Sequence, residues 1–316
     1  MQEELYREES LFEYIKRHIT DGRLPADFSL PEKEEAEAEG KLRFADGALD
    51  GITMYHMMGS TLTAEEKEEM RSLIFLISDG EIQEADEALC SFAKRHRTLS
   101  VIDEFEDTIR QNREVLNAPA LYRYGVRLLV KSAEPECVKF GMAILELFII
   151  RDEKVKEAIR ILGLSNEFSL FALFLMQQWE NANEEIFELA KKVTGWGRVH
   201  AVEKLEPETE EIRDWFLKEG IKNQVLPDYS ALTCFEKAKV KERLSGNLTE
   251  AEFSCIGEIL DAMLTEGPVP GISAVEDCTQ VLERYLVHAR NRALSPENEE
   301  IILRIKKYID DKKEND

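Results

Sequence analysis

The sequence predicts an all-α protein, and three observations support this fold class. Apolar residues recur along the chain with a period near 3.6, which is the spacing of one helix face. No alternating runs of Val, Ile and Thr bounded by Asn-Gly or Asp-Gly turns indicate β-strands. Helix starts are also marked by capping boxes, in which a Ser or Thr is followed three positions later by an acid. Three capping boxes are expected: Thr63 with Glu66, Thr249 with Glu252, and Ser273 with Glu276.

The N-terminal part of the chain is expected to contribute extra helices. Their expected ranges are 3–21, 31–39, 46–58, 63–78, 81–95 and 99–115. The stretch 24–41, between the expected helices 3–21 and 46–58, is rich in proline and glutamate. It predicts a solvated connection that includes at most the short helix 31–39. We therefore expect an N-terminal helical region over 1–116, with an acidic linker at about 24–41, that packs on the rest of the chain.

The remaining residues, 117–316, are expected to form regularly spaced helices with short connections. Their expected ranges are 118–131, 136–150, 152–163, 166–180, 183–193, 196–206, 208–219, 227–237, 249–266, 273–292 and 296–310. The last helix is predicted to begin after Ser295, because Pro296 is tolerated at a first helical position, where its missing N–H costs nothing.

Charge and composition exclude several classes of partner. The formal net charge of −23 gives the average surface the wrong sign for binding phosphates or anionic lipids, so neither a nucleic acid nor a membrane is an expected partner. The acidic N-terminus does not resemble a signal peptide, and the apolar stretches are short, which predicts a cytoplasmic protein. Five scattered cysteines without a C-x-x-C pair predict reduced thiols.

An internal repeat runs through the middle of the chain. Four segments align on central alanines that are 29, 29 and 30 residues apart: Ala143, Ala172, Ala201 and Ala231. Apolar residues recur one and four positions after each alanine, so every unit is expected to bury the same helix face. A small residue at the centre of that face lets a neighbouring helix approach closely. Two helices per repeat of this length are typical of an α-solenoid.

The segment over about 118–240 resembles HEAT and armadillo-type repeats. The second helix of a HEAT unit carries an arginine, a small pair and a leucine at fixed offsets, and this frame is matched by Arg198, Ala201, Val202 and Leu205. The other units have Phe140, Ser169 and Asp228 in place of the arginine, so the match is to a divergent member. The resemblance implies an α–α superhelix, a HEAT-like solenoid, that presents its surface to a partner.

The positions one residue before and two residues after each central alanine lie next to the buried face, and their polarity changes along the repeats. They are apolar in the first two units and polar in the last two: Met142, Leu145, Phe171 and Phe174, then His200, Glu203, Ser230 and Thr233. A helix that is apolar nearly all round must be covered on both sides. Either the N-terminal helices cover this second face, or it forms a hydrophobic groove for a partner helix or for a second copy of the chain in a homodimer.

Two small clusters of polar residues are candidates for binding. His200 and Glu203 stand at i and i+3 on one helix, where two side chains can share a ligand or a proton, although a surface pair explains the same letters. Asp50 and His56 lie in the unusual stretch 44–59, which could form a polar pocket or an ordinary helix end. The candidate binding-surface residues are therefore His200, Glu203, Arg198, Phe171, Phe174, Asp50 and His56.

No nucleotide-binding, metalloprotease or nucleophile-elbow motif occurs in the sequence. We therefore expect no catalytic residues, no metal ligands and no cofactor. The sequence favours a non-enzymatic helical-repeat scaffold or adaptor that binds another protein, with a basic partner surface to complement its own charge. The alternative is an enzyme or small-ligand binder with a pocket between the N-terminal helices and the repeats.

Overall fold

The computed structural model confirms the all-α prediction. It describes residues 9–31, 44–56, 61–267, 269–290 and 292–315. Within these ranges the structure has 17 α-helices and is 68% helical, and the only β-type pairing there is one isolated bridge between Thr20 and Arg23. Successive helices pack against each other, as in an α–α superhelix.

The chain divides into two compact units, 1–197 and 198–316. The helices of the first unit are α2 (Leu11–His18), α4 (Ala48–His56), α5 (Ala64–Asp79), α6 (Ile82–Ala93), α7 (Thr98–Gln111), α8 (Ala118–Lys131), α9 (Pro135–Glu146), α10 (Glu153–Gly163), α11 (Ser169–Met176) and α12 (Ala182–Ala190). The division falls at 197/198 and not at the expected 116/117, because α5, α6 and α7 share one apolar core with α8 and α9.

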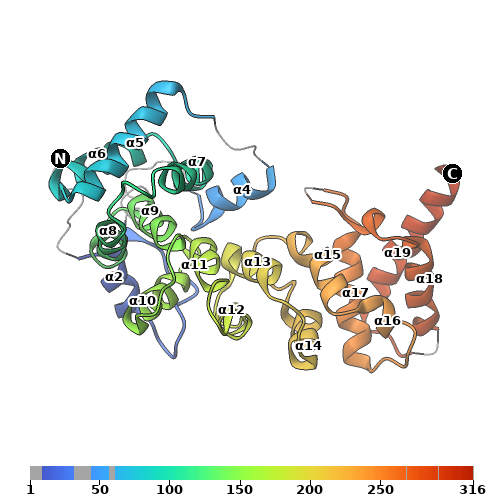
Figure 1. The fold of residues 1–316 in the computed structure, drawn as a ribbon. Coiled ribbons are helices and arrows are strands. Elements are labelled where there is room, and N and C mark those ends of the chain that lie inside the picture. The colour runs from blue at the N-terminus through green and yellow to red at the C-terminus, as the bar shows by residue number, and fades with distance from the viewer. Residues whose placement is uncertain (1–8, 32–43, 57–60, 268, 291, 316) are drawn as a thin grey trace. The chain divides into compact units, whose positions relative to one another are not determined.

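In the first unit, N-terminal helices cover the later ones on two sides (Figure 1). The helices α6 and α7 pack on α9, while α2 packs on α8 and α10. The apolar second face is therefore covered: Met142, Leu145 and Phe171 are all buried. For these three residues the alternative of an open groove is wrong.

The helix α4 lies against the Gly-Trp-Gly turn at the end of this unit. A Cβ atom at Gly51 would lie 2.2 Å from the Trp196 ring, so only glycine permits this approach. Gly47 has a φ of +73°, and a Cβ there would lie 2.3 Å from the Asn166 carbonyl oxygen. Tyr55 adds a ring contact to Trp196, with centroids 6.1 Å apart. Trp196 is thus the platform on which α4 docks.

The helix α13 (Gly195–Lys204) spans the division, and the second unit continues from it. Its further helices are α14 (Glu210–Glu219), α15 (Asp228–Lys237), α16 (Val240–Arg243), α17 (Glu250–Met263), the 3₁₀ helix η1 (Ile272–Ala274), α18 (Cys278–Ala289) and α19 (Pro296–Asn315). The central helix α17 packs on α14, α15, α18 and α19. Within its core the rings of Phe253 and Tyr285 are stacked, with centroids 4.6 Å apart.

Two of the three expected capping boxes are present. The side chains of Thr63 and Thr249 each accept a hydrogen bond from the backbone N–H three residues on. The side chain of the glutamate at that position accepts a hydrogen bond from the backbone N–H of the threonine. The box expected at Ser273 is wrong, because Ser273 lies in η1 and the next helix begins only at Cys278. The short helix α16 was not expected from the sequence.

Part of the expected acidic linker is not solvated. Leu30 is completely buried, so the chain before it runs along the protein surface and inserts this side chain into the first unit. The rest of that linker, with the helix expected over 31–39, lies almost wholly outside the described residues.

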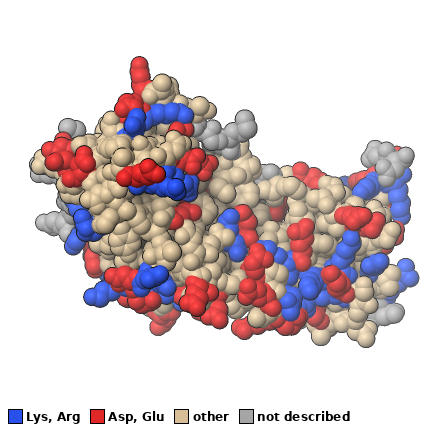
Figure 2. Space-filling view, viewed as in Figure 1, with Lys and Arg blue, Asp and Glu red and all other residues tan. Residues whose placement is uncertain are grey.

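The surface mixes both signs of charge. Figure 2 shows Asp and Glu side chains interleaved with Lys and Arg over the displayed face.

All five cysteines are free thiols, of which only Cys255 is not buried. Within the described ranges, none of the helices has the length and apolar character needed to cross a bilayer.

The close approach of α4 to Trp196 gives a first prediction. Gly51→Ala should lower the free energy of unfolding by about 1–3 kcal/mol, because the new methyl group must displace the indole ring or the helix. Urea unfolding measures the effect. The control is Gly246→Ala, where the added methyl group meets only an ordinary contact at 3.6 Å. Equal stabilities of the two variants would contradict the docking of α4 on Trp196.

Candidate functional site

The most unusual feature of the first unit is a buried cluster of charges around Lys139. Lys139 is completely buried on α9, and its Nζ atom donates to three carboxylates. The acceptors are Asp50 Oδ2 at 2.6 Å, Glu167 Oε1 at 2.7 Å and Glu136 Oε1 at 3.1 Å. An ammonium group has three N–H donors, so all of them are used.

Side chains from four parts of the chain meet in this cluster. Asp50 comes from α4, Glu136 from the first turn of α9, and Glu167 from the turn before α11. Arg97, which precedes α7, donates from Nη2 to Asp50 Oδ1 at 2.6 Å and lies 3.4 Å from Glu136 Oε1. The cluster therefore ties α4 to the middle of the first unit by charge-assisted hydrogen bonds.

Hydrogen bonds reach every oxygen of the three carboxyl groups. The second oxygens of the two glutamates accept from uncharged donors: Thr98 N–H and Oγ1 donate to Glu136 Oε2 at 2.7 and 2.9 Å, and Gly47 N–H donates to Glu167 Oε2 at 2.9 Å. All six oxygens thus accept a hydrogen bond, which is the pattern expected for ionised carboxylates. Three carboxylates and two cations give the cluster a net charge of −1.

The pKa shifts agree with this assignment. Burial would raise the pKa of Glu136, but the charges of Lys139 and Arg97 lower it below the ordinary glutamate value. Burial would likewise lower the pKa of Lys139, and the surrounding carboxylates more than offset this and raise it. A raised pKa favours the protonated ammonium form, which is the form that donates to the three carboxylates.

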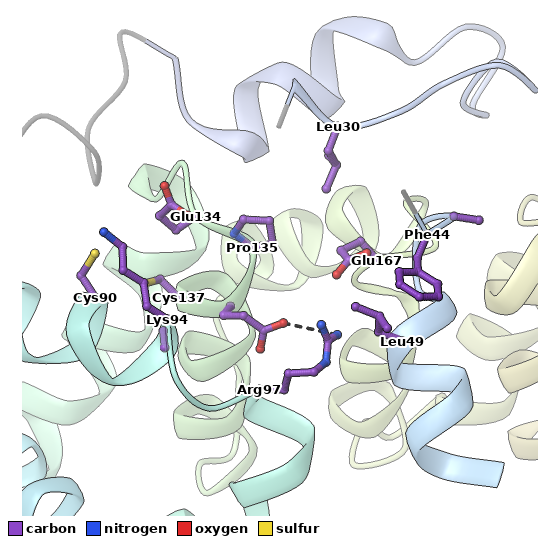
Figure 3. Close-up of a pocket in the computed structure, with 13 residues that line it drawn as sticks. Leu30, Phe44, Leu49, Cys90, Lys94, Arg97, Glu134, Pro135, Cys137 and Glu167 are labelled. Carbon is purple, nitrogen blue, oxygen red and sulfur yellow. Dashed lines mark ion pairs between the residues drawn. The ribbon is translucent and has the colours of Figure 1, made fainter. Parts of the chain in front are cut away.

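A pocket of about 320 Å³ opens beside this cluster (Figure 3). Figure 3 shows Leu30, Phe44 and Leu49 on one side and Cys90, Lys94 and Cys137 on the other, with Arg97 and Glu167 between them. Glu134, Pro135 and Glu136 complete the wall at the N-terminus of α9. The pocket is thus lined by residues of the N-terminal region, by the start of α9 and by the turn before α11, and its floor is formed by the cluster members Arg97, Glu136 and Glu167.

The residues that line the pocket are better suited to binding a ligand than to a covalent reaction with it. Its two thiols, Cys90 and Cys137, are buried, and burial raises the pKa of Cys137 well above the ordinary thiol value, so the reactive thiolate is disfavoured. Among the described residues, no group of three or more Asp, Glu, His or Cys side chains is placed to hold a metal ion. Rigid charges next to an apolar wall are instead typical of a recognition site.

The structure brings only one of the expected surface residues in the first unit into this site. Asp50 is buried in the charged cluster, so its expected surface position is wrong. Phe171 is also buried, with Lys139 Nζ 5.7 Å from its ring centroid, while Phe174 is half-buried. His56 is exposed at the end of α4 and does not line the pocket.

The expected surface residues of the second unit are largely internal. His200 is 1% exposed and Arg198 is 8% exposed, so neither contributes to an open binding surface. Arg198 donates to the Glu219 carbonyl oxygen at 2.9 Å and lies over the Trp215 ring, which joins α13 to α14. Glu203 is half-buried and lies 3.3 Å from Lys204 Nζ.

Sequence reasoning missed Arg97, Glu136, Lys139 and Glu167. One signal was available: Lys139 stands inside the otherwise apolar run 137–145, and a charge at such a position must be paired when the helix is buried. The identities of its partners could not be read from the sequence, because they lie 89 residues before Lys139 and 28 after it as well as on the same helix turn.

Comparisons with protein-family models, with curated proteins and with solved structures find no match to this chain.

The charged cluster gives a second prediction. Lys139→Met should lower the free energy of unfolding by about 3–5 kcal/mol, since it leaves buried carboxylates without their cation. Chemical unfolding measures the loss. Lys131→Met, at the exposed end of α8, is the matched control and should change stability by less than about 0.5 kcal/mol. A small effect at both positions would show that Lys139 does not hold the cluster together.

The buried His200 gives a third prediction, about pH. Burial lowers the pKa of His200 to about 4, so the folded protein keeps the ring neutral while the unfolded chain takes up a proton below about 6.5. The contribution of the neutral His200 ring to the free energy of unfolding is therefore complete above about pH 6.5, and it falls as the pH drops toward the pKa of the folded protein. At pH 5 the loss from this group is about 2 kcal/mol.

His200→Leu should remove this part of the pH dependence. The test compares urea unfolding of the variant and the unaltered protein at pH 7.5 and pH 5. Other titrating groups contribute equally to both proteins, so the difference isolates His200. The same loss of stability in both proteins between the two pH values would contradict the burial of a neutral ring.

Proposed function

We propose that this chain is a non-enzymatic helical-repeat protein that binds another protein with a basic surface. The observation that carries the proposal is the excess negative charge held rigidly at the floor of the pocket. Every ionisable group of that cluster is engaged in holding the cluster itself, so its chemistry serves recognition and not turnover. A preorganised charge of this kind favours a partner of opposite sign.

The helix register supports the repeat part of the proposal. The four central alanines fall on α9, α11, α13 and α15, and each is at most 1% exposed. Alternate helices therefore bury equivalent positions at a nearly constant spacing, which is what stacked helix pairs require. The resemblance to HEAT-type repeats remains an inference from this register.

Overall charge supports the choice of partner. A formal net charge of −23 repels acidic proteins and nucleic acids over distances of about 8–10 Å at physiological ionic strength. The same field attracts a basic protein and increases its association rate, in a way that salt suppresses.

A second candidate function is binding of a small molecule, and the pocket is the observation that favours it. Its volume of about 320 Å³ is within the range of small-ligand sites, and its wall combines apolar and charged groups. The pocket lies between N-terminal residues and α9. The alternative expected from the sequence, an enzyme or small-ligand binder, requires a pocket between the N-terminal helices and the repeats.

Affinity capture tests the leading proposal and gives the fourth prediction. The full chain, immobilised and incubated with nuclease-treated extract at about 50 mM salt, should retain a small set of basic proteins that is released at about 500 mM salt. A purified member of that set should bind with an association rate that falls steeply over the same range. The nuclease step removes basic proteins that are carried only by RNA.

The same experiment can contradict the proposal. Retention of acidic proteins, or an association rate that does not change with salt, would show that the negative charge does not guide recognition. Duplex DNA should give no gel shift at physiological salt, and micromolar binding would overturn the charge argument.

A further inference from the structure

We infer that the pocket beside Lys139 is a binding site for an aliphatic ammonium group, and that it receives a lysine side chain of the partner. This inference rests on the proposed function for the source of the lysine, but the preference for a cation rests on the pocket alone. The evidence consists of the excess of carboxylates over cations around the pocket, the carboxylate of Glu134 on its wall, and the apolar surface beside them.

Among the residues that the structure describes, acidic groups outnumber basic groups around the pocket. The carboxylates of Asp50, Glu134, Glu136 and Glu167 stand against the cations of Lys94, Arg97 and Lys139, which leaves an excess of one negative charge. A buried charge without a counterion is costly, and that cost falls when a cation approaches. Two of the three carboxylates that accept from Lys139, Glu136 and Glu167, line the pocket directly, so a ligand can reach them.

The wall adds a carboxylate with no partner of its own. Glu134 lines the pocket and is half-buried, and its side chain makes no hydrogen bond or ion pair within the part of the chain that the structure describes. It occupies the N-cap of α9 without bonding the helix through its side chain. The helix N-terminus carries only a partial positive charge, which does not cancel a full carboxylate.

Apolar residues provide the surface for an aliphatic stem. Leu30, Phe44 and Leu49 stand across the pocket from Pro135 and Ala93, as Figure 3 shows for the labelled members. A lysine side chain combines four methylene groups with a charged end, and it commonly places that stem on apolar surface. The volume of about 320 Å³ exceeds that of one such side chain, so its backbone can remain at the mouth.

Two cations line the pocket, Arg97 and Lys94, and three carboxylates outnumber them there: Glu134, Glu136 and Glu167. Arg97 Nη2 already faces Asp50 at 2.6 Å and Glu136 at 3.4 Å, so its charge is matched before any ligand arrives. The Arg97 charge is included in the net −1 of the cluster. An anion would have to approach the three carboxylates as well, whereas a cation meets an excess of acceptors.

Ligand-observed NMR with the full chain tests the inference. The probe is Nα-acetyl-lysine N-methylamide, which presents a lysine side chain with neutral backbone amides on both sides. It should bind with a Kd in the millimolar range expected for a ligand of this size. The neutral norleucine analogue should bind at least about tenfold more weakly, and the glutamate analogue should show no binding.

Glu134→Gln provides the matched test of the site, because it alters the wall without disturbing the floor. It should weaken binding of the lysine probe by about threefold, the effect expected for losing one exposed charge contact. Glu114→Gln removes an exposed carboxylate elsewhere in the same unit and should leave the probe affinity unchanged.

Four outcomes would overturn the inference. They are equal binding of the norleucine analogue, tighter binding of the glutamate analogue, an unchanged affinity in Glu134→Gln, and binding of butylamine without binding of the blocked lysine. The last of these would assign the pocket to a free amine. If basic partners are captured but the lysine probe does not bind, the inference fails while the proposed function stands. If the probe binds and no basic partner is captured, the proposed function fails and so does the assignment to a partner's lysine.

Discussion

The ion cluster around Lys139 is the interaction on which the first unit depends. It is the only place in the described structure where one completely buried ammonium group holds three carboxylates, and those carboxylates come from α4, α9 and the turn before α11. Removing two unlike charges from water costs several kcal/mol per ion, so such a cluster persists only when its donors and acceptors are all matched. Here the six carboxylate oxygens and the three ammonium protons meet that condition.

The cluster also explains how an N-terminal segment becomes part of the pocket. Asp50 on α4 forms ion pairs with Lys139 and Arg97. Gly47 and Gly51 let the same segment approach Asn166 and Trp196 closely. With α4 in place, Leu49 and the preceding Phe44 form one wall of the pocket. The same hydrogen bonds that position the helix thus build the pocket and set its charge.

The surroundings of Lys139 and Cys137 affect the reactivity of both groups. A nucleophilic lysine needs a lowered pKa, and a nucleophilic cysteine must be a thiolate. The carboxylates around Lys139 raise its pKa, and burial keeps the thiol of Cys137 protonated. The proposed binding therefore rests on electrostatics, because the floor has one negative charge in excess beside an apolar wall.

Helix periodicity, capping letters and the alanine spacing determined the fold class and most helix positions from the sequence alone, because these signals act within one or two turns. They could not determine the site. Lys139 is visible in the sequence as a charge inside an apolar run, but Asp50, Arg97 and Glu167 become its neighbours only through packing of distant helices. Burial likewise overturned the surface position expected for His200, and for Phe171 it decided between the two alternatives that the sequence left open, since a helix face is exposed or covered according to what packs on it. Tertiary structure decided which charges met, and therefore the sign of the pocket.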